Sequence, residues 1–117
     1  MQFIQKVLLV CASAVALSAC AQVKHKAMEL SPGDSKARVL EIMGAPDDRQ
    51  FNGENEALQY GMVVSIGVCD YTVVWLHDGK TSGITSYRHF STMGCRQGLQ
   101  PISWSEAPIA AANPSAK

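Results

Sequence analysis

The stretch "DYTVVWLHDGKTSGITSY", Asp70 to Tyr87, decides the fold. Two runs rich in β-branched and aromatic residues flank Asp78-Gly79, and an Asp-Gly pair between such runs is the strongest short-range signal for a β-hairpin. A two-residue turn predicts a register with three opposed pairs: His77 with Lys80, Trp75 with Ser82, and Val73 with Ile84. We therefore expect two antiparallel strands joined at this turn.

This register distributes the apolar side chains over both faces of the hairpin. One face carries Tyr71, Val73, Trp75 and Ile84, and we expect it to receive a helix. Val74 and Leu76 fall on the other face. Either the C-terminal segment covers part of that face, or Val74 and Leu76 form a surface for a protein partner.

A second stretch, "GDSKARVLEIMGAP", predicts a helix of about eight residues that begins near Lys36. Its apolar residues recur at helical spacing, Asp34 or Ser35 can cap its first turn, and Gly44 provides a left-handed C-cap before Pro46. The cap and turn residues are Gly33, Asp34, Ser35, Gly44, Pro46, Asp78 and Gly79. A helix this short needs an apolar surface to pack on, and the predicted sheet supplies one.

The region before the hairpin contributes a third strand. "LQYGMVVSIGV", residues 58–68, is rich in β-branched and aromatic residues, with Gly61 and Gly67 at bulges or strand ends. "DDRQFNGENEA", residues 47–57, is polar and is interpreted as a loop. The sequence thus predicts an α+β fold in which one short helix, or two, packs on a three-stranded antiparallel sheet.

The N-terminus has the pattern of a secretory signal. Lys6 precedes an apolar run from Val7 to Leu17, which is too short to span a bilayer as a helix. "LSAC", residues 17–20, resembles a bacterial lipobox, which implies cleavage after Ala19 and a diacylglyceryl thioether on Cys20. Three acyl chains would anchor the protein permanently without a membrane-spanning segment. The residue after the cysteine is Ala21 rather than aspartate, which implies the periplasmic face of the outer membrane.

These signals divide the chain into four parts. Residues 1–19 are the lipoprotein signal peptide, and residues 20–30 are the lipidated N-terminus and a tether. Residues 31–104 form the α+β domain, and residues 105–117 are small, polar and proline-containing, which predicts a disordered tail.

The four cysteines are expected to have three fates. Cys11 leaves with the signal peptide, Cys20 carries the lipid, and Cys69 and Cys95 remain. In an oxidising periplasm this pair predicts a disulfide. Closing the loop of about 26 residues between the two cysteines contributes about 3 kcal/mol to stability.

A metal site is the alternative use of these two cysteines. His77 and His89 lie between them in sequence, but the spacings do not form the close ligand pairs typical of zinc sites. We therefore expect no metal, and no cofactor other than the covalent lipid.

The "GDS" at residues 33–35 invites an enzymatic interpretation with Ser35 as a nucleophile. Lys36 follows the serine where an apolar residue is required, and no Asp-x-x-His follows. Charge is balanced, with 10 Lys and Arg against 10 Asp and Glu in 117 residues, so net charge favours neither nucleic acid nor an anionic surface. We expect no catalysis, no nucleic-acid partner and no small-molecule substrate.

Three stretches together resemble a known family: "LSPGDSKARVLEIMGAPDD" (residues 30–48), "ALQY" (57–60) and "VVWLHDGKTSGI" (73–84). They are similar to the SmpA/OmlA (BamE-like) family of bacterial outer-membrane lipoproteins. The matching positions are Leu30, Gly33, Val39, Gly44, Pro46, Tyr60, Trp75, Asp78 and Gly79. The resemblance implies helices on a three-stranded antiparallel sheet, an envelope protein partner, and a non-catalytic role in β-barrel protein assembly or envelope integrity.

Two other functions remain open from the sequence. One is a small periplasmic inhibitor-like or ligand-binding module, which an exposed concave aromatic patch around Tyr60, Tyr71 and Tyr87 would favour. The other is a stress-induced structural lipoprotein without a stable partner. A flat apolar patch around Val74 and Leu76 would instead favour a protein partner.

Overall fold

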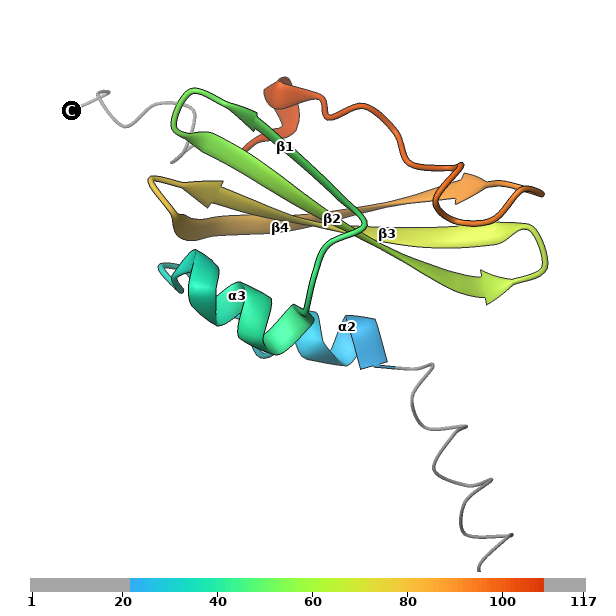
Figure 1. Ribbon diagram of the computed structural model, residues 1–117, viewed down its shortest axis with the longest axis horizontal. Coiled ribbons are helices and arrows are strands. Elements are labelled where there is room, and N and C mark those ends of the chain that lie inside the picture. Colours follow the sequence, from blue (N-terminus) through green and yellow to red (C-terminus); the bar gives the residue numbers. More distant parts are fainter. Residues whose placement is uncertain (1–21, 109–117) are drawn as a thin grey trace, which may run out of the picture.

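The computed structural model describes residues 22–108, and the signal peptide, Cys20 and residues 109–117 lie outside that range. Within this range the fold is α+β, with two short helices and a four-stranded antiparallel sheet of order β1-β2-β3-β4. The elements are α2 (Gln22–Ala27), α3 (Lys36–Met43), β1 (Asp48–Asn52), β2 (Asn55–Ser65), β3 (Val68–His77), β4 (Lys80–Phe90) and the 3-10 turn η2 (Trp104–Glu106). The helices lie on one side of the sheet, and the segment after β4 crosses the other side (Figure 1).

The predicted helix is confirmed as α3, with the expected start and length. The Ser35 hydroxyl accepts a hydrogen bond from the Arg38 backbone N–H at 3.1 Å, which is the role of an N-cap. Gly44 has φ 80° and ψ −166°, so the helix ends at a positive φ but the chain leaves extended rather than in the left-handed helical conformation.

The sheet has a fourth strand where a loop was expected. Residues 48–52 form β1, which pairs antiparallel with β2 from Asp48 opposite Gln59 to Asn52 opposite Asn55. Because β1 is an edge strand with mostly exposed side chains, its sequence lacks the apolar alternation that indicates a strand. The prediction of three strands is therefore wrong by this one polar strand.

The hairpin turn at Asp78-Gly79 is confirmed, with His77 opposite Lys80, but the register beyond it is shifted. A β-bulge leaves Ser82 unpaired in the ladder. The pairs are therefore Leu76 with Thr81, Trp75 with Gly83, Val74 with Ile84, and Val73 with Thr85. The predicted pairs of Trp75 with Ser82 and of Val73 with Ile84 are wrong because the bulge adds one residue to β4.

The helices pack on the opposite face from the one expected. The core on their side consists of Val39, Met43, Leu58, Tyr60, Val74 and Leu76. Val74 is 0% exposed and Leu76 is 1% exposed, so neither can form a partner surface. The reason is the period-two alternation of β3, which puts Cys69 on the Trp75 face, so a segment bonded to Cys69 occupies that face and leaves the other to the helices.

The C-terminal segment covers the Trp75 face. Its core contains Ala57, Val73, Trp75 and Ala107, with Tyr87, Ile102 and Trp104 packed against it. Packing therefore continues to Pro108, past the domain boundary expected at residue 104.

The described part of the expected tether also joins the domain. Residues 22–27 form α2, and Val23, Ala27 and Leu30 pack against the helix-side core. Their spacing of four and three residues places them on one face of a helix, a pattern too short to stand out in a mixed sequence.

Candidate functional site

The predicted cap and turn residues have structural roles. Asp34 accepts a hydrogen bond from the Ser31 N–H at 2.7 Å, and Gly33 (φ 88°) bonds backbone to backbone with Thr81. Asp78 and Gly79 both have positive φ in the hairpin turn, and Pro46 is half-buried after α3. The hydroxyl of Ser35, the residue that resembles a nucleophile, is engaged at the helix start.

The predicted disulfide between Cys69 and Cys95 is present, with Cα atoms 5.6 Å apart. The Tyr71 hydroxyl donates to the Cys95 carbonyl, and the Tyr71 and Tyr87 rings stack with centroids 4.7 Å apart. Because the two cysteines are bonded to each other, they cannot supply the thiolates of a cysteine–histidine metal site.

A buried glutamine, which the sequence did not single out, organises the polar contacts beneath the C-terminal segment. The Gln59 amide accepts from the Tyr87 hydroxyl at 2.6 Å and donates to Asp48 and to the Gln100 carbonyl, both at 3.0 Å. The Gln100 N–H in turn donates to the Tyr87 hydroxyl at 3.0 Å. These bonds satisfy a fully buried amide and fix the segment on the sheet.

The three tyrosines do not form the exposed aromatic patch that would favour a ligand-binding module. Tyr60 and Tyr71 are buried, on opposite faces of the sheet, and Tyr87 is half-buried beneath the C-terminal segment. A small cleft remains along that segment, lined in part by Val73 and Trp75, and its volume is about 230 Å³. No observation on these residues favours the ligand-binding alternative.

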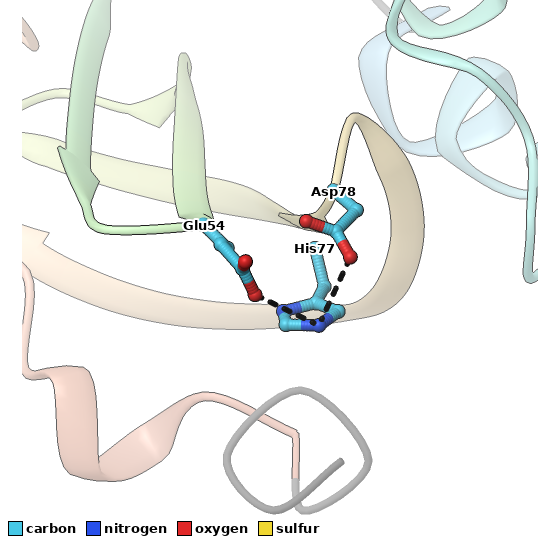
Figure 2. A group of neighbouring side chains, drawn as sticks. All are labelled: Glu54, His77 and Asp78. Carbon is cyan, nitrogen blue, oxygen red and sulfur yellow. Dashed lines mark ion pairs between the residues drawn. The ribbon is translucent and has the colours of Figure 1, made fainter.

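Glu54, His77 and Asp78 come together where the β1–β2 and β3–β4 turns meet (Figure 2). The His77 Nε2 atom lies 3.8 Å from a Glu54 oxygen and 3.6 Å from an Asp78 oxygen. Its Nδ1 atom lies 3.0 Å from the Asn55 side-chain oxygen, within hydrogen-bond distance.

This cluster clamps the two turns together. The Asp78 N–H also donates to the Glu54 carbonyl at 3.0 Å, so backbone and side chains join the same turns. Both carboxylates are largely exposed, and within residues 22–108 no fourth His, Cys, Asp or Glu joins the three. The arrangement is that of a surface ion-pair cluster, and it carries no metal assignment.

Among the described residues, five exposed large apolar side chains gather at the other end of the sheet. We call this group the apolar tip, and it consists of Val63, Val64, Ile66, Phe90 and Met93. Their exposed fractions run from 40% at Val64 to full exposure at Ile66. It forms at the β2–β3 turn and the adjoining end of β4, where Val68 pairs with Phe90 and the Ser91 N–H donates to the Gly67 carbonyl.

The apolar tip was not among the sequence-based predictions, although a signal for it exists. "GMVVSIGVC", residues 61–69, contains no charged residue, yet a hairpin turn is normally polar. Nothing in the sequence indicated that the helix layer would stop short of this turn.

No family model, curated protein or solved structure matches the chain. The resemblance to the SmpA/OmlA family therefore stays a prediction. Among the described residues, neither short helix has the length and apolar character needed to cross a bilayer.

Proposed function

We propose that the protein is a bacterial lipoprotein anchored by Cys20 to the periplasmic face of the outer membrane. Its domain acts there as a non-catalytic binding module in outer-membrane assembly or envelope integrity, as the SmpA/OmlA resemblance implies. The observation that carries the proposal is a disulfide-bonded domain in which α2, the first helix of the described residues, begins two residues after the cysteine of a lipobox-like stretch.

The disulfide supports the exported part of this proposal. Such bonds persist in oxidising compartments and are rare in the cytosol. The Cys69–Cys95 pair has fitting geometry and fixes the C-terminal segment, so it has a structural purpose in a small domain.

The organisation of the domain supports a binding role rather than catalysis. Ser35 caps a helix, Gln59 and the tyrosines satisfy one another, and His77 pairs with exposed carboxylates. The apolar tip exposes five large apolar side chains, and such a group is typical of surfaces that bind a macromolecule or a membrane.

The anchor is tested by the intact mass of the protein purified from bacterial membranes. We expect a chain that begins at Cys20 and carries the added lipid mass. Cys20→Ser should abolish processing, whereas Cys11→Ser, in the segment that is removed, should leave the mature product unchanged. An unmodified Cys20 would overturn the proposal.

The choice between inner and outer membrane is tested by substitution of Ala21, the residue after Cys20. In an enteric-type host, Ala21→Asp should move the lipidated protein to the inner membrane, and Ala21→Ser should leave it in the outer membrane. The same distribution for both variants would contradict the sorting part of the proposal.

The binding role is tested by crosslinking in intact cells, followed by pull-down from detergent-solubilised membranes. We expect an envelope protein to be recovered and deletion to increase permeability. Recovery of the lipidated protein alone, with unchanged permeability, would contradict this role and favour a structural lipoprotein without a stable partner.

A further inference from the structure

The apolar tip lies beyond the helix layer, at the end of the sheet that the loop after β4, which carries Met93, also reaches (Figure 1). Ile66 stands at the β2–β3 turn, and its neighbours in the tip point to both faces, because Val63 pairs with Cys69 while Phe90 pairs with Val68. The hairpin extends beyond the helices in Figure 1. A projecting apolar turn is suited to insertion into an apolar medium such as lipid, and not to binding a ligand.

On the side that faces β3, the backbone of β2 is paired almost to the turn, apart from a bulge at Val64, and this pairing matters for contact with hydrocarbon. The β2–β3 ladder runs to Ser65 opposite Val68, and the Gly67 carbonyl accepts from Ser91 at 2.8 Å. Exposed backbone groups are costly in lipid, and ladder hydrogen bonds remove much of that cost.

The base of the tip is rigid and polar. The Cys69–Cys95 disulfide ties the loop after β4 to β3, and the Arg88 guanidinium makes two bonds to Asp70, at 2.6 and 3.1 Å. The apolar side chains thus lie at the end of the hairpin, and the charged pair lies next to them on the side of the domain. This arrangement is expected of a segment that inserts only partly into a membrane interface.

The anchor proposed at Cys20 attaches close to this end of the molecule. Cys20 precedes Gln22, the first residue of α2, by two residues, so the chain between them spans at most about 7 Å. Figure 1 shows the N-terminal end of α2 and the β2–β3 turn directed to the same end of the domain. A bilayer that holds the lipid would therefore face this end of the domain.

We infer that the apolar tip inserts into the membrane leaflet that holds the Cys20 lipid, so that the domain rests on the bilayer at two points with a fixed orientation. This inference rests on the proposed function, since it requires the anchor. The occupant is a bilayer because the surface is projecting, uncharged from Gly61 to Cys69 and adjacent to the attachment point.

The test places a tryptophan in the tip and measures its quenching by brominated lipids. Full-length Ile66→Trp is expressed in bacteria, purified from membranes and reconstituted in vesicles that contain brominated acyl chains. The control is Phe51→Trp, because Phe51 is also exposed (70%) but lies on β1, beside the β1–β2 turn. Wild-type protein gives the background from Trp75 and Trp104.

We expect the added fluorescence of Ile66→Trp to be quenched at least about twofold more than that of Phe51→Trp, since an interfacial segment places its apolar side chains within reach of the acyl chains. Equal or absent quenching in both lipidated variants would overturn the inference and leave the proposed anchor intact. Crosslinks from residue 66 to a protein, together with absent quenching, would assign the tip to a protein partner.

The intact mass of each variant separates this outcome from failure of the anchor. A chain without lipid on Cys20 overturns the proposed function and the inference with it, whereas a lipidated chain without quenching overturns the inference alone. Because Ile66 is fully exposed, its substitution should preserve the fold, which formation of the Cys69–Cys95 bond verifies by non-reducing mass analysis.

Discussion

The indole rings of Trp75 and Trp104 meet edge to face, with centroids 5.9 Å apart and planes at 71°. This contact joins the middle of the sheet to the segment after β4, near the C-terminal end of the described chain. The segment is therefore part of the core, and its removal would expose Trp75, which is 2% accessible.

Trp104→Ala should lower the free energy of unfolding by about 2 kcal/mol, because a partly buried aromatic contact and its apolar area are lost. Urea unfolding measures the change, and the emission of Trp75 should shift to longer wavelength as water reaches it. Met28→Ala, at an exposed position, is the control and should be nearly neutral. Equal stability of both variants would contradict the assignment of Trp104 to the core.

The disulfide should contribute about 3 kcal/mol, because it closes a loop of 26 residues in the unfolded chain. Comparison of urea unfolding of the mature protein with the Cys69→Ser/Cys95→Ser double variant measures this difference. A reducing agent should destabilise the parent to about the same extent and leave the double variant unchanged. If reduction has no effect on the parent, the bond does not stabilise the fold.

Thr81→Val should raise stability by about 1 kcal/mol. The Thr81 hydroxyl is buried and forms no hydrogen bond within residues 22–108, so it incurs a desolvation cost that an isosteric methyl group avoids.

Thr85→Val is the matched control for that variant. The Thr85 hydroxyl accepts from the Trp75 indole N–H at 2.8 Å, so the same substitution should destabilise the domain by leaving a buried donor unpaired. Thermal or urea unfolding of both variants gives the two signs, and equal signs would contradict this account.

Stability should fall at alkaline pH. Burial, and to a lesser extent the charge of Asp47, raises the pKa of Tyr60 to about 12, and burial also raises the pKa values of Tyr71 and Tyr87. An unfolded tyrosine ionises near pH 10, so the contribution of Tyr60 is full below about pH 10 and is lost as pH rises towards 12.

Urea unfolding between about pH 9 and pH 11.5 tests this dependence. Tyr60→Phe should weaken it, at the cost of the hydrogen bond from the Tyr60 hydroxyl to the Gly44 carbonyl. A parent protein with constant stability over that interval would show that burial does not oppose ionisation of these tyrosines.

The features that the sequence predicted correctly depend on local chemistry. The bounds of α3 follow from Ser35 and Gly44, the hairpin follows from Asp78-Gly79, and the disulfide follows from the count of cysteines left after export. Each of these signals lies within a few residues or follows from composition.

The errors concern relationships between distant residues. The bulge opposite Trp75 shifts the register, and no local signal at Ser82 predicts it. β1 was missed because it is an edge strand with polar side chains. The face of the sheet that the C-terminal segment covers could have been predicted, because Cys69 and Trp75 are six residues apart on one strand and therefore share a face. The network around Gln59 joins residues up to 41 positions apart, which local pattern analysis does not detect.

The C-terminal segment is held on the sheet at both ends, by Cys95 bonded to Cys69 and by Pro108 against Gly83, where a Cβ atom would lie 2.5 Å from the proline ring. Loss of the contact at Pro108 has a different consequence from loss of the disulfide, because only the disulfide is covalent. If the Pro108 end detaches, the covalent end keeps the segment at a high effective concentration over its own binding face, so rebinding is a fast unimolecular step. Thermal fluctuations then interrupt the cover of Trp75 only briefly, and the exposed core has little time to meet another unfolded chain.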